Sequence, residues 1–354
     1  MTAITHVVTI IGARPQFVKA AAVSRKLVEA GVRESLIHTG QHYDREMSAV
    51  FFQELRIPEP QENLGVGSGT HAVQTGEMMI GLERVLTSGL MPDCVMVYGD
   101  TNSTLAGAVV AAKLHIPVVH VEAGLRSFNR RMPEEINRIV TDRLAGLLFC
   151  PTASSIENLR SEGVTDGVHL TGDVMLDATR LFGDVARRKV PLDAVTRHAP
   201  GAYYAATVHR AENTDDPVRL AGIFEGLGRI GLPVVLPLHP RTRSRLRDIE
   251  VPANVETREP VGYLASLTLV RHARAVLTDS GGLQKEALWL GVPCITLRDE
   301  TEWVETLEGG WNQLVGADPC RIEAAAARRP EDPVPAFARE GASERIVEIL
   351  RHHF

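Results

Sequence analysis

The sequence predicts an α/β protein built from two doubly wound domains, each with a parallel sheet covered by helices. Three observations lead to this prediction. The chain has 354 residues, which suits two domains of about 150 residues each. Short, continuous apolar runs alternate with helical patterns, as expected for strands buried on both faces of a parallel sheet. The alternation occurs in both halves of the chain, so we expect two Rossmann-like domains with a cleft between them.

In the first half, five β-branched or apolar runs predict strands. They lie at residues 6–11, 35–39, 94–98, 116–121 and 147–150. Apolar residues at helical spacing, or a run rich in alanine, predict helices among them. These helices lie at residues 17–27, 104–113 and 134–145.

The second half repeats the alternation. Strands are expected at residues 203–208, 233–238, 275–278 and 292–297, and helices at residues 217–230 and 283–290. The predicted organisation is an N-terminal domain at 1–178, a linker at 179–200, a C-terminal domain at 201–335 and a final segment at 336–354. The linker is expected because the stretch is rich in Arg, Asp and Pro. The final segment has an amphipathic pattern and is expected to pack back on the first domain as a helix.

Composition and charge exclude several functional classes. The 38 Lys and Arg against 44 Asp and Glu give a net charge of -6, which argues against a nucleic-acid partner. No apolar run approaches the roughly 20 residues of a membrane span, and the start lacks the pattern of a signal peptide. The four cysteines are scattered and predict reduced thiols. We therefore expect a cytoplasmic protein without a membrane partner, and no metal site, because metal-binding spacings of His and Cys are absent.

Two segments between a strand and a helix are candidates for binding phosphate. Residues 12–16 follow the first strand, and there Arg14 can bind a phosphate through two hydrogen bonds, with Lys19 adding charge. Residues 278–286 offer Ser280, Gly281 and Gly282 at a helix start, with Glu286 placed to accept hydrogen bonds from a ribose. Each segment could instead be an ordinary helix cap. Neither has the GxGxxG pattern of a dinucleotide site.

Three carboxylates of the first half are candidates for acid and base catalysis. Asp100 and Glu122 follow predicted strands, and Glu134 lies in the first turn of a predicted helix, with Arg126 nearby. Each residue alone is more often structural, and acidic residues at a helix start are ordinary partners of the helix dipole. Carboxylates gathered at one sheet edge raise one another's pKa, which favours proton transfer near neutral pH.

Three histidines also follow predicted strands. His209 is followed by Arg210, His239 ends the next strand, and His42 follows Gln41. A lone histidine is more often a buried and hydrogen-bonded ring, but the end of a parallel strand is where ligands bind in open sheets.

In combination, these motifs resemble the non-hydrolysing UDP-N-acetylglucosamine 2-epimerase family. The chain carries, in the family's order, GARPQFVKAA, TGQHYDREM, YGDTNSTLAGA, HVEAGLRS, MPEEINR, LTGDVMLDA, VHRAEN, LTDSGGLQKEA and RDETEW. The resemblance covers nearly the whole chain. It implies a GT-B-like fold, a homodimer, a UDP-sugar substrate and no cofactor.

The resemblance also implies a reaction and assigns residues to it. The C2 proton of the sugar is removed, UDP is eliminated anti to leave a 2-acetamidoglucal, and UDP adds back after reprotonation from the other face. The implied catalytic residues are Asp100, Glu122, Glu134 and His209, with the base and the acid among the carboxylates left open. The implied UDP or substrate contacts are Arg14, Lys19, Gln41, His42, Arg126, Arg210, His239, Ser280, Gly281, Gly282, Glu286, Arg298 and Glu302.

Three motifs depart from the commonest family pattern. HRAEN stands at 209–213 for the usual HRREN, RDETEWVE at 298–305 for RDTTERPE, and HPRTR at 239–243 for HxNP. These variants resemble the branch that epimerises UDP-2,3-diacetamido-2,3-dideoxyglucuronic acid, whose carboxylate suits additional arginines. The motifs are also compatible with a GT-B glycosyltransferase, with an epimerase that releases free sugar, and with a UDP-sugar sensor without catalytic activity.

Overall fold

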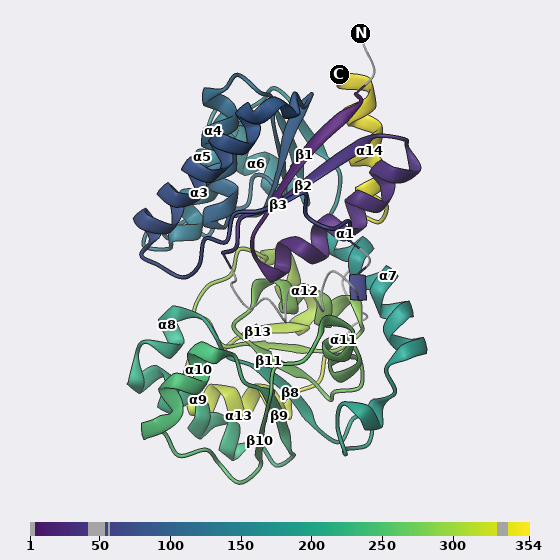
Figure 1. The fold of residues 1–354 in the computed structure, drawn as a ribbon. Helices are drawn as coiled ribbons and strands as arrows, with labels where there is room; N and C mark the ends of the chain where they lie inside the picture. Colours follow the sequence, from purple (N-terminus) through teal and green to yellow (C-terminus); the bar gives the residue numbers. More distant parts are fainter. Residues whose placement is uncertain (1–3, 42–53, 56, 331–338) are drawn as a thin grey trace. The chain divides into compact units, whose positions relative to one another are not determined.

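The computed structural model describes residues 4–41, 54–55, 57–330 and 339–354 (Figure 1). The chain divides into two compact units. Unit 1 contains Met1–Ala178 and Ala338–Phe354, and unit 2 contains Thr179–Phe337. Each unit has its own parallel sheet and its own core.

Unit 1 contains a seven-stranded sheet in the order β3-β2-β1-β4-β5-β6-β7, and all its strand pairs are parallel. Its strands are β1 His6–Ile11, β2 Arg33–His38, β3 Glu62–Asn63, β4 Cys94–Tyr98, β5 Val118–Val121, β6 Leu147–Cys150 and β7 Val168–Leu170. The order reverses direction at β1, as in doubly wound sheets. Every residue of β1, β4 and β5 is buried, which explains their continuous apolar sequences.

Helices of unit 1 connect and cover these strands. They are α1 Arg14–Glu29, α3 His71–Val85, α4 Asn102–Lys113, α5 Pro133–Leu144, α6 Ala153–Ser161 and α14 Ala342–His353. The core joins strand residues such as Ile10 and Val97 to Met78 and Leu82 of α3. The final helix α14 packs against α1, so the last residues of the chain complete unit 1 (Figure 1).

Unit 2 contains a six-stranded parallel sheet in the order β10-β9-β8-β11-β12-β13. Its strands are β8 Tyr204–Thr207, β9 Val234–Pro237, β10 Val255–Arg258, β11 Val276–Thr278, β12 Cys294–Thr296 and β13 Asn312–Leu314. Its helices are α8 Ala211–Thr214, α9 Pro217–Arg229, α10 Pro240–Arg245, α11 Tyr263–Arg271, α12 Gly281–Trp289 and α13 Pro319–Ala327. The two parallel sheets confirm the predicted α/β class.

The stretch expected to be a linker is largely helical. Helix α7 spans Val174–Lys189, and a short 3₁₀ helix follows at Leu192–Ala194. Ala178, Phe182 and Ala186 are buried at a spacing of four residues, which gives α7 an apolar face. Its last turn carries Arg187, Arg188 and Lys189, which interact favourably with the dipole at a helix C-terminus. The content of Arg, Asp and Pro, on which the linker was predicted, does not reveal this helical pattern.

Among the described residues, none of the helices combines the length and the apolar character needed to cross a bilayer.

Candidate functional site

The turn between β1 and α1 is closed by a side chain of its own helix. The Oε1 atom of Gln16 accepts hydrogen bonds from the backbone N–H of Gly12 at 2.8 Å and of Ala13 at 3.0 Å. Its Nε2 atom donates to the carbonyl oxygen of Tyr98 at 2.8 Å, which ties the turn to β4. The first backbone donors of this turn therefore already have partners. The predicted contacts of this segment with phosphate depend on Arg14, the first residue of α1, and on Lys19.

Lys19 and Glu122 form a buried ion pair in unit 1. The Lys19 side chain is 9% exposed and the Glu122 side chain 7%. Glu122 directly follows β5 and has a φ of +72°, a conformation that non-glycine residues rarely adopt. Backbone strain of this kind persists where the surrounding structure enforces it, and it concentrates at functional sites. A nearby ammonium group stabilises the ionised carboxylate.

Asp100 follows β4 and pairs with Arg138 of α5. The Asp100 Oδ2 and Arg138 Nη2 atoms are 2.5 Å apart, and the Asp100 side chain is 31% exposed while that of Arg138 is 2% exposed. Asn137 donates to the backbone carbonyl of Asp100 at 2.9 Å. The carboxylate is thus oriented by α5 while remaining accessible to a ligand.

The two glutamates at the start of α5 have different surroundings. Glu135 is buried, accepts hydrogen bonds from the backbone N–H groups of Ser127 and Phe128 at 2.9 Å each, and pairs with Arg138 at 2.9 Å. Glu134 is half-buried. Glu135 therefore holds the loop before α5, and Glu134 remains the candidate for catalysis.

Arg126 lies inside a buried network. Its side chain is 1% exposed and bonds both oxygens of Glu162, at 2.7 and 2.8 Å, and Asp142 Oδ2 at 2.8 Å. Its Nη1 atom also donates to the carbonyl of Leu125 at 2.6 Å. These contacts engage Nε, Nη1 and Nη2, so Arg126 supports the backbone that follows Glu122, and its contact with the substrate stays a prediction.

Gln41 is half-buried and binds the start of α4, where its Oε1 atom accepts hydrogen bonds from Ser103 Oγ at 2.7 Å and Ser103 N at 3.1 Å. His42, the neighbouring candidate, lies outside the described residues.

In unit 2, helix α12 begins with the predicted serine and glycines. Ser280 is the N-cap, and its Oγ atom accepts a hydrogen bond from the backbone N–H of Leu283 at 3.4 Å. Gly281 is buried, and a Cβ atom there would lie 2.5 Å from Glu302 Oε1. At Gly282 the nearest atom to such a Cβ would be Ser280 Oγ at 4.0 Å. Gly281 therefore allows close packing inside unit 2, whereas Gly282 borders open space.

Glu286 lies one turn further along α12 and is buried. Its Oε1 atom accepts a hydrogen bond from the Tyr263 hydroxyl at 2.7 Å. Burial, together with the nearby Glu286 carboxylate, raises the pKa of Tyr263 well above its usual value, so the hydroxyl stays a donor. This bond fixes the orientation of the carboxylate proposed to bind a ribose.

Asp279, which the sequence analysis did not single out, fixes the position of His209. Its carboxylate accepts hydrogen bonds from the backbone N–H groups of His209 and Arg210 at 2.9 Å each. Burial opposes ionisation of Asp279, but attraction to His209 and these hydrogen bonds outweigh it and lower the pKa to about 2. The signal in the sequence was an aspartate directly after a strand, at the edge where ligands bind.

The remaining candidates of unit 2 form ion pairs or a helix cap. Arg298 is fully buried and pairs with Glu302 at 2.9 Å, and Arg210 lies 3.6 Å from the other oxygen of Glu302. His239 is exposed at the start of α10, where its Nδ1 atom accepts a hydrogen bond from the backbone N–H of Arg241 at 3.2 Å. The rings of His209 and His239 lie 5.5 Å apart.

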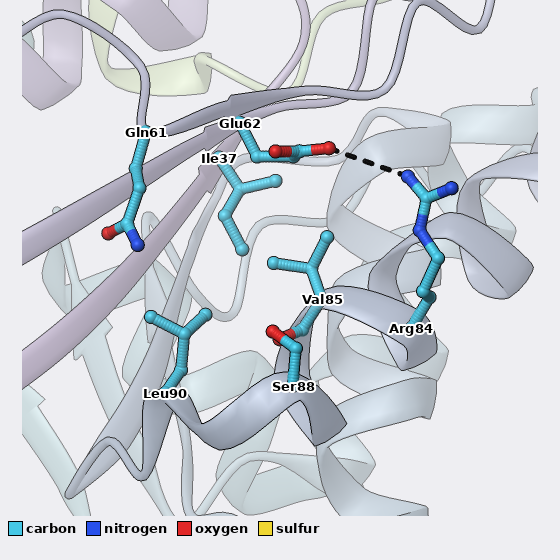
Figure 2. Close-up of a pocket in the computed structure, with 7 residues that line it drawn as sticks. All are labelled: Ile37, Gln61, Glu62, Arg84, Val85, Ser88 and Leu90. Atoms are coloured by element: carbon cyan, nitrogen blue, oxygen red, sulfur yellow. Dashed lines mark hydrogen bonds and ion pairs between the residues drawn. The ribbon is translucent and has the colours of Figure 1, made fainter.

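A separate pocket lies on unit 1 and shares none of the candidate residues. It is lined by Ile37, Gln61, Glu62, Arg84, Val85, Ser88 and Leu90 (Figure 2). Its charged lining residues, Glu62 and Arg84, pair with each other at 3.4 Å. The part of the chain that the structure describes holds no cluster of three His, Cys, Asp or Glu side chains suited to a metal ion.

Comparisons with known proteins agree over almost the whole chain. Residues 25–351 match the family model described as UDP-N-acetylglucosamine 2-epimerase. A Pseudomonas aeruginosa protein named UDP-2,3-diacetamido-2,3-dideoxy-D-glucuronate 2-epimerase is 47% identical, with 97% of this chain and 99% of the relative covered. The UDP-N-acetylglucosamine 2-epimerase of Methanocaldococcus jannaschii is 42% identical, with 97% and 98% covered.

Solved structures give the same result for the fold. The crystal structure of the Methanocaldococcus jannaschii UDP-GlcNAc 2-epimerase in complex with UDP-GlcNAc and UDP has a TM-score of 0.90 at 41% identity, covering 98% of this chain and 99% of that one. A calicheamicin glycosyltransferase matches with a TM-score of 0.53 at 15% identity, covering 99% and 94%. The second likeness concerns the fold alone, and together the two confirm the GT-B-like class.

Proposed function

Because the chain belongs to the UDP-N-acetylglucosamine 2-epimerase family, we propose that it inverts C2 of a UDP-2-acetamido sugar without hydrolysing it. The observation that carries the proposal is the set of carboxylates held at strand and helix ends of unit 1, within a chain that matches the family throughout. Asp100 and Glu122 follow neighbouring strands, and Glu134 lies in the first turn of α5.

The reaction needs one group to take a proton from C2 and another to return a proton to the opposite face. A carboxylate removes the C2 proton, the electron pair of that bond forms the C1=C2 double bond, and the C1–O bond breaks to release UDP. Protonation at C2 from the other face and attack of the UDP oxygen on C1 then give the epimer. Asp100, Glu122 and Glu134 divide the two proton transfers between them. Lys19 pairs with Glu122, and a neighbouring ammonium group favours the ionised form of a carboxylate, which a base requires.

Unit 2 supplies most of the contacts with UDP in this proposal. The start of α12, with Ser280, Gly281 and Gly282, presents backbone N–H groups to the diphosphate. Glu286 accepts hydrogen bonds from the ribose, and His209, oriented by Asp279, stabilises the departing diphosphate. The further contacts proposed with UDP or the sugar are those of Arg14, Gln41, His42, Arg210, His239, Arg298 and Glu302. No cofactor takes part, and the protein acts in the cytoplasm as a homodimer.

A second candidate is the same chemistry on UDP-2,3-diacetamido-2,3-dideoxyglucuronic acid. It is supported by the 47% identity to the Pseudomonas aeruginosa relative of that name and by the arginines at positions 241 and 243 in the variant HPRTR motif. Guanidinium groups bind a uronate carboxylate through paired, charge-assisted hydrogen bonds.

Proton NMR in D2O tests the reaction and the substrate together. The purified protein is incubated with UDP-GlcNAc and, separately, with the diacetamido-uronate. Loss of the C2 proton signal, together with growth of a manno-configured UDP-sugar, is the expected result, and the faster substrate identifies the branch. Absence of deuterium at C2 with both sugars would contradict the proposal, and UDP accumulating in step with free sugar would indicate hydrolysis instead.

A glycosyltransferase and a sensor predict different outcomes of one substitution. Glu122→Gln removes a carboxylate that proton transfer at C2 requires and that transfer to an acceptor does not, so an epimerase loses turnover. A transferase would keep part of its activity toward an acceptor, and a sensor would bind the UDP-sugar without turnover before and after the change.

A further inference from the structure

His120 of β5 is a fully buried histidine whose two ring nitrogens both face acceptors. Its Nε2 atom lies 2.8 Å from the carbonyl oxygen of Gly99, and its Nδ1 atom lies 2.7 Å from Asp142 Oδ1. His120 is two residues before Glu122, and Gly99 directly precedes Asp100. The ring therefore contacts the residue that precedes Asp100 and belongs to the strand that leads into Glu122.

The hydrogen bonds determine the protonation state of this ring. A carbonyl oxygen can only accept, so Nε2 carries a proton. Asp142 is held as a carboxylate, since Oδ2 accepts hydrogen bonds from Arg126 at 2.8 Å and from the backbone N–H of Gly124 at 3.2 Å. Nδ1 facing a carboxylate oxygen at 2.7 Å then carries a proton as well.

The charges of the surrounding network support this assignment. Burial opposes ionisation of Asp142, but its bonds to His120 and Arg126 outweigh burial and lower its pKa. The side chains of His120 and Asp142 are 0% exposed, that of Arg126 is 1% exposed and that of Glu162 is 28% exposed. Glu162 is partly exposed and also faces Arg143, so the cationic partners of the buried Asp142 carboxylate are Arg126 and His120.

The Gly99 turn is the part of the site that this ring holds. Gly99 has a φ of +63°, and its backbone N–H donates to the carbonyl of Val121 at 3.0 Å. With His120 donating to its carbonyl oxygen, both backbone polar groups of Gly99 are bound to β5. A Cβ atom at Gly99 would lie 3.2 Å from both Glu122 Oε2 and Lys19 Nζ. The turn therefore lies close against the Lys19–Glu122 ion pair and leads directly into Asp100.

We propose that His120 is held as a doubly protonated imidazolium and is a positioning residue that fixes the Gly99–Asp100 turn through the Gly99 carbonyl. The role in catalysis rests on the proposed epimerase function, whereas the protonation state does not. A small displacement of a catalytic group, about 1 Å, can cost on the order of 10²-fold in rate. We therefore expect His120 to affect kcat, and the KM for the UDP-sugar to change little.

The protonation state is tested by NMR of the intact protein with ¹⁵N-labelled histidine at pH 7.5. The His120 signals are assigned by their loss in His120→Gln. Both ring nitrogens of His120 are expected to show bound protons that exchange slowly with solvent. A ring with one unprotonated nitrogen would overturn the proposal. This result is independent of whether the protein turns over any sugar.

The positioning role is tested with two variants that each retain one half of the ring's bonding. His120→Gln can still donate to the Gly99 carbonyl from the far end of its side chain, whereas the shorter His120→Asn reaches only toward Asp142. Both lose the positive charge, so their stabilities are expected to be similar. We expect His120→Gln to keep kcat within about tenfold of the parent and His120→Asn to lose about 10²-fold, with KM little changed in both.

The matched control is His6, a buried histidine of β1 in the same sheet, whose Nε2 atom bonds Ser35 Oγ at 2.9 Å. His6→Gln is expected to leave kcat unchanged. Equal kcat values for the Gln and Asn variants of His120, or a loss seen only in the fraction of folded protein, would overturn the positioning role. An inactive parent protein would instead contradict the proposed function. The NMR result would then still test whether both ring nitrogens of His120 carry protons.

Discussion

The carboxylate of Asp279 accepts a hydrogen bond from the backbone N–H of His209 and lies 3.0 Å from the ring Nδ1 of the same residue. One buried aspartate thus fixes both the backbone and the imidazole orientation of a residue that is 36% exposed at its side chain. The direction in which His209 presents its other nitrogen is set from inside the protein, before any ligand arrives.

This pairing predicts a dependence of stability on acid. The pKa of Asp279 is about 2 in the folded protein against an ordinary value of 3.8, so its carboxylate stabilises the fold above about pH 4. That contribution is lost as the pH falls toward 2. Asp279→Asn is expected to lower the free energy of unfolding at pH 7 by about 2 kcal/mol, with a smaller difference at pH 3.

Tryptophan fluorescence during urea unfolding measures this effect, because all three tryptophans, Trp289, Trp303 and Trp311, lie in unit 2. Asp299→Asn, at an exposed aspartate that pairs with Arg219, is the control and should leave stability unchanged. If Asp279→Asn lowered the free energy of unfolding equally at pH 7 and pH 3, the ionised carboxylate of Asp279 would not be the source of the stability.

Glu122→Gln is expected to lower kcat by about 10²- to 10⁴-fold, the usual contribution of a positioned acid or base, with little change in the affinity for UDP. Exchange of the C2 proton in D2O is the measurement. Glu29→Gln, at an exposed glutamate of α1, is the control and should exchange at the parent rate. If exchange at C2 persisted in the Glu122 variant, another carboxylate would be the base.

Arg126→Met is expected to destabilise unit 1 by about 3–5 kcal/mol, because it leaves Asp142 as a buried carboxylate with one cation fewer. Calorimetric unfolding measures the loss, and Arg160→Met, at an exposed ion pair with Glu157, should leave stability unchanged. A large rise in KM without loss of stability would instead restore the role in substrate binding that the sequence predicted for Arg126.

Substitutions of the two glycines of α12 are expected to have different effects. Gly281→Ala places a methyl group 2.5 Å from Glu302 Oε1 and 3.2 Å from Trp303 Nε1, so it should lower both stability and UDP affinity. Gly282→Ala meets only open space in unit 2, so it should weaken UDP binding without loss of stability. Calorimetric titration with UDP and thermal unfolding separate the two effects. Full UDP affinity in both variants would refute the proposed diphosphate site.

The strands were the most predictable part of the fold. β1 and β4 are continuous apolar runs because both faces of their sheet are covered, and a run of that kind is visible in the sequence. Helix α7 was missed because the charges on its exposed face outnumber the buried Ala178, Phe182 and Ala186. Composition averages over both faces of a helix and hides such a pattern.

For the site, sequence could identify residues but not their partners. Gln16 binds a backbone N–H of the turn after β1, where the sequence predicted a phosphate site. Glu135 binds the backbone of a loop, next to Glu134, which the sequence predicted to be catalytic. His120 stood in a recognised motif, yet its role depends on Gly99 and Asp142, which are 21 and 22 residues away along the chain. These pairings depend on the packing of neighbouring strands and helices, which local sequence does not show.

Because α14 belongs to unit 1 but follows unit 2 in the chain, the two units are completed at different stages of synthesis. Unit 2 is one continuous segment, so its whole sheet is synthesised before α14. Unit 1 lacks the partner of α1 until Ala342–His353 have been synthesised, and these residues follow all of unit 2. The unit that carries the proposed catalytic carboxylates is therefore completed after the other, and a polypeptide that lacks α14 retains every residue of the unit proposed to bind UDP alongside an unfinished unit 1.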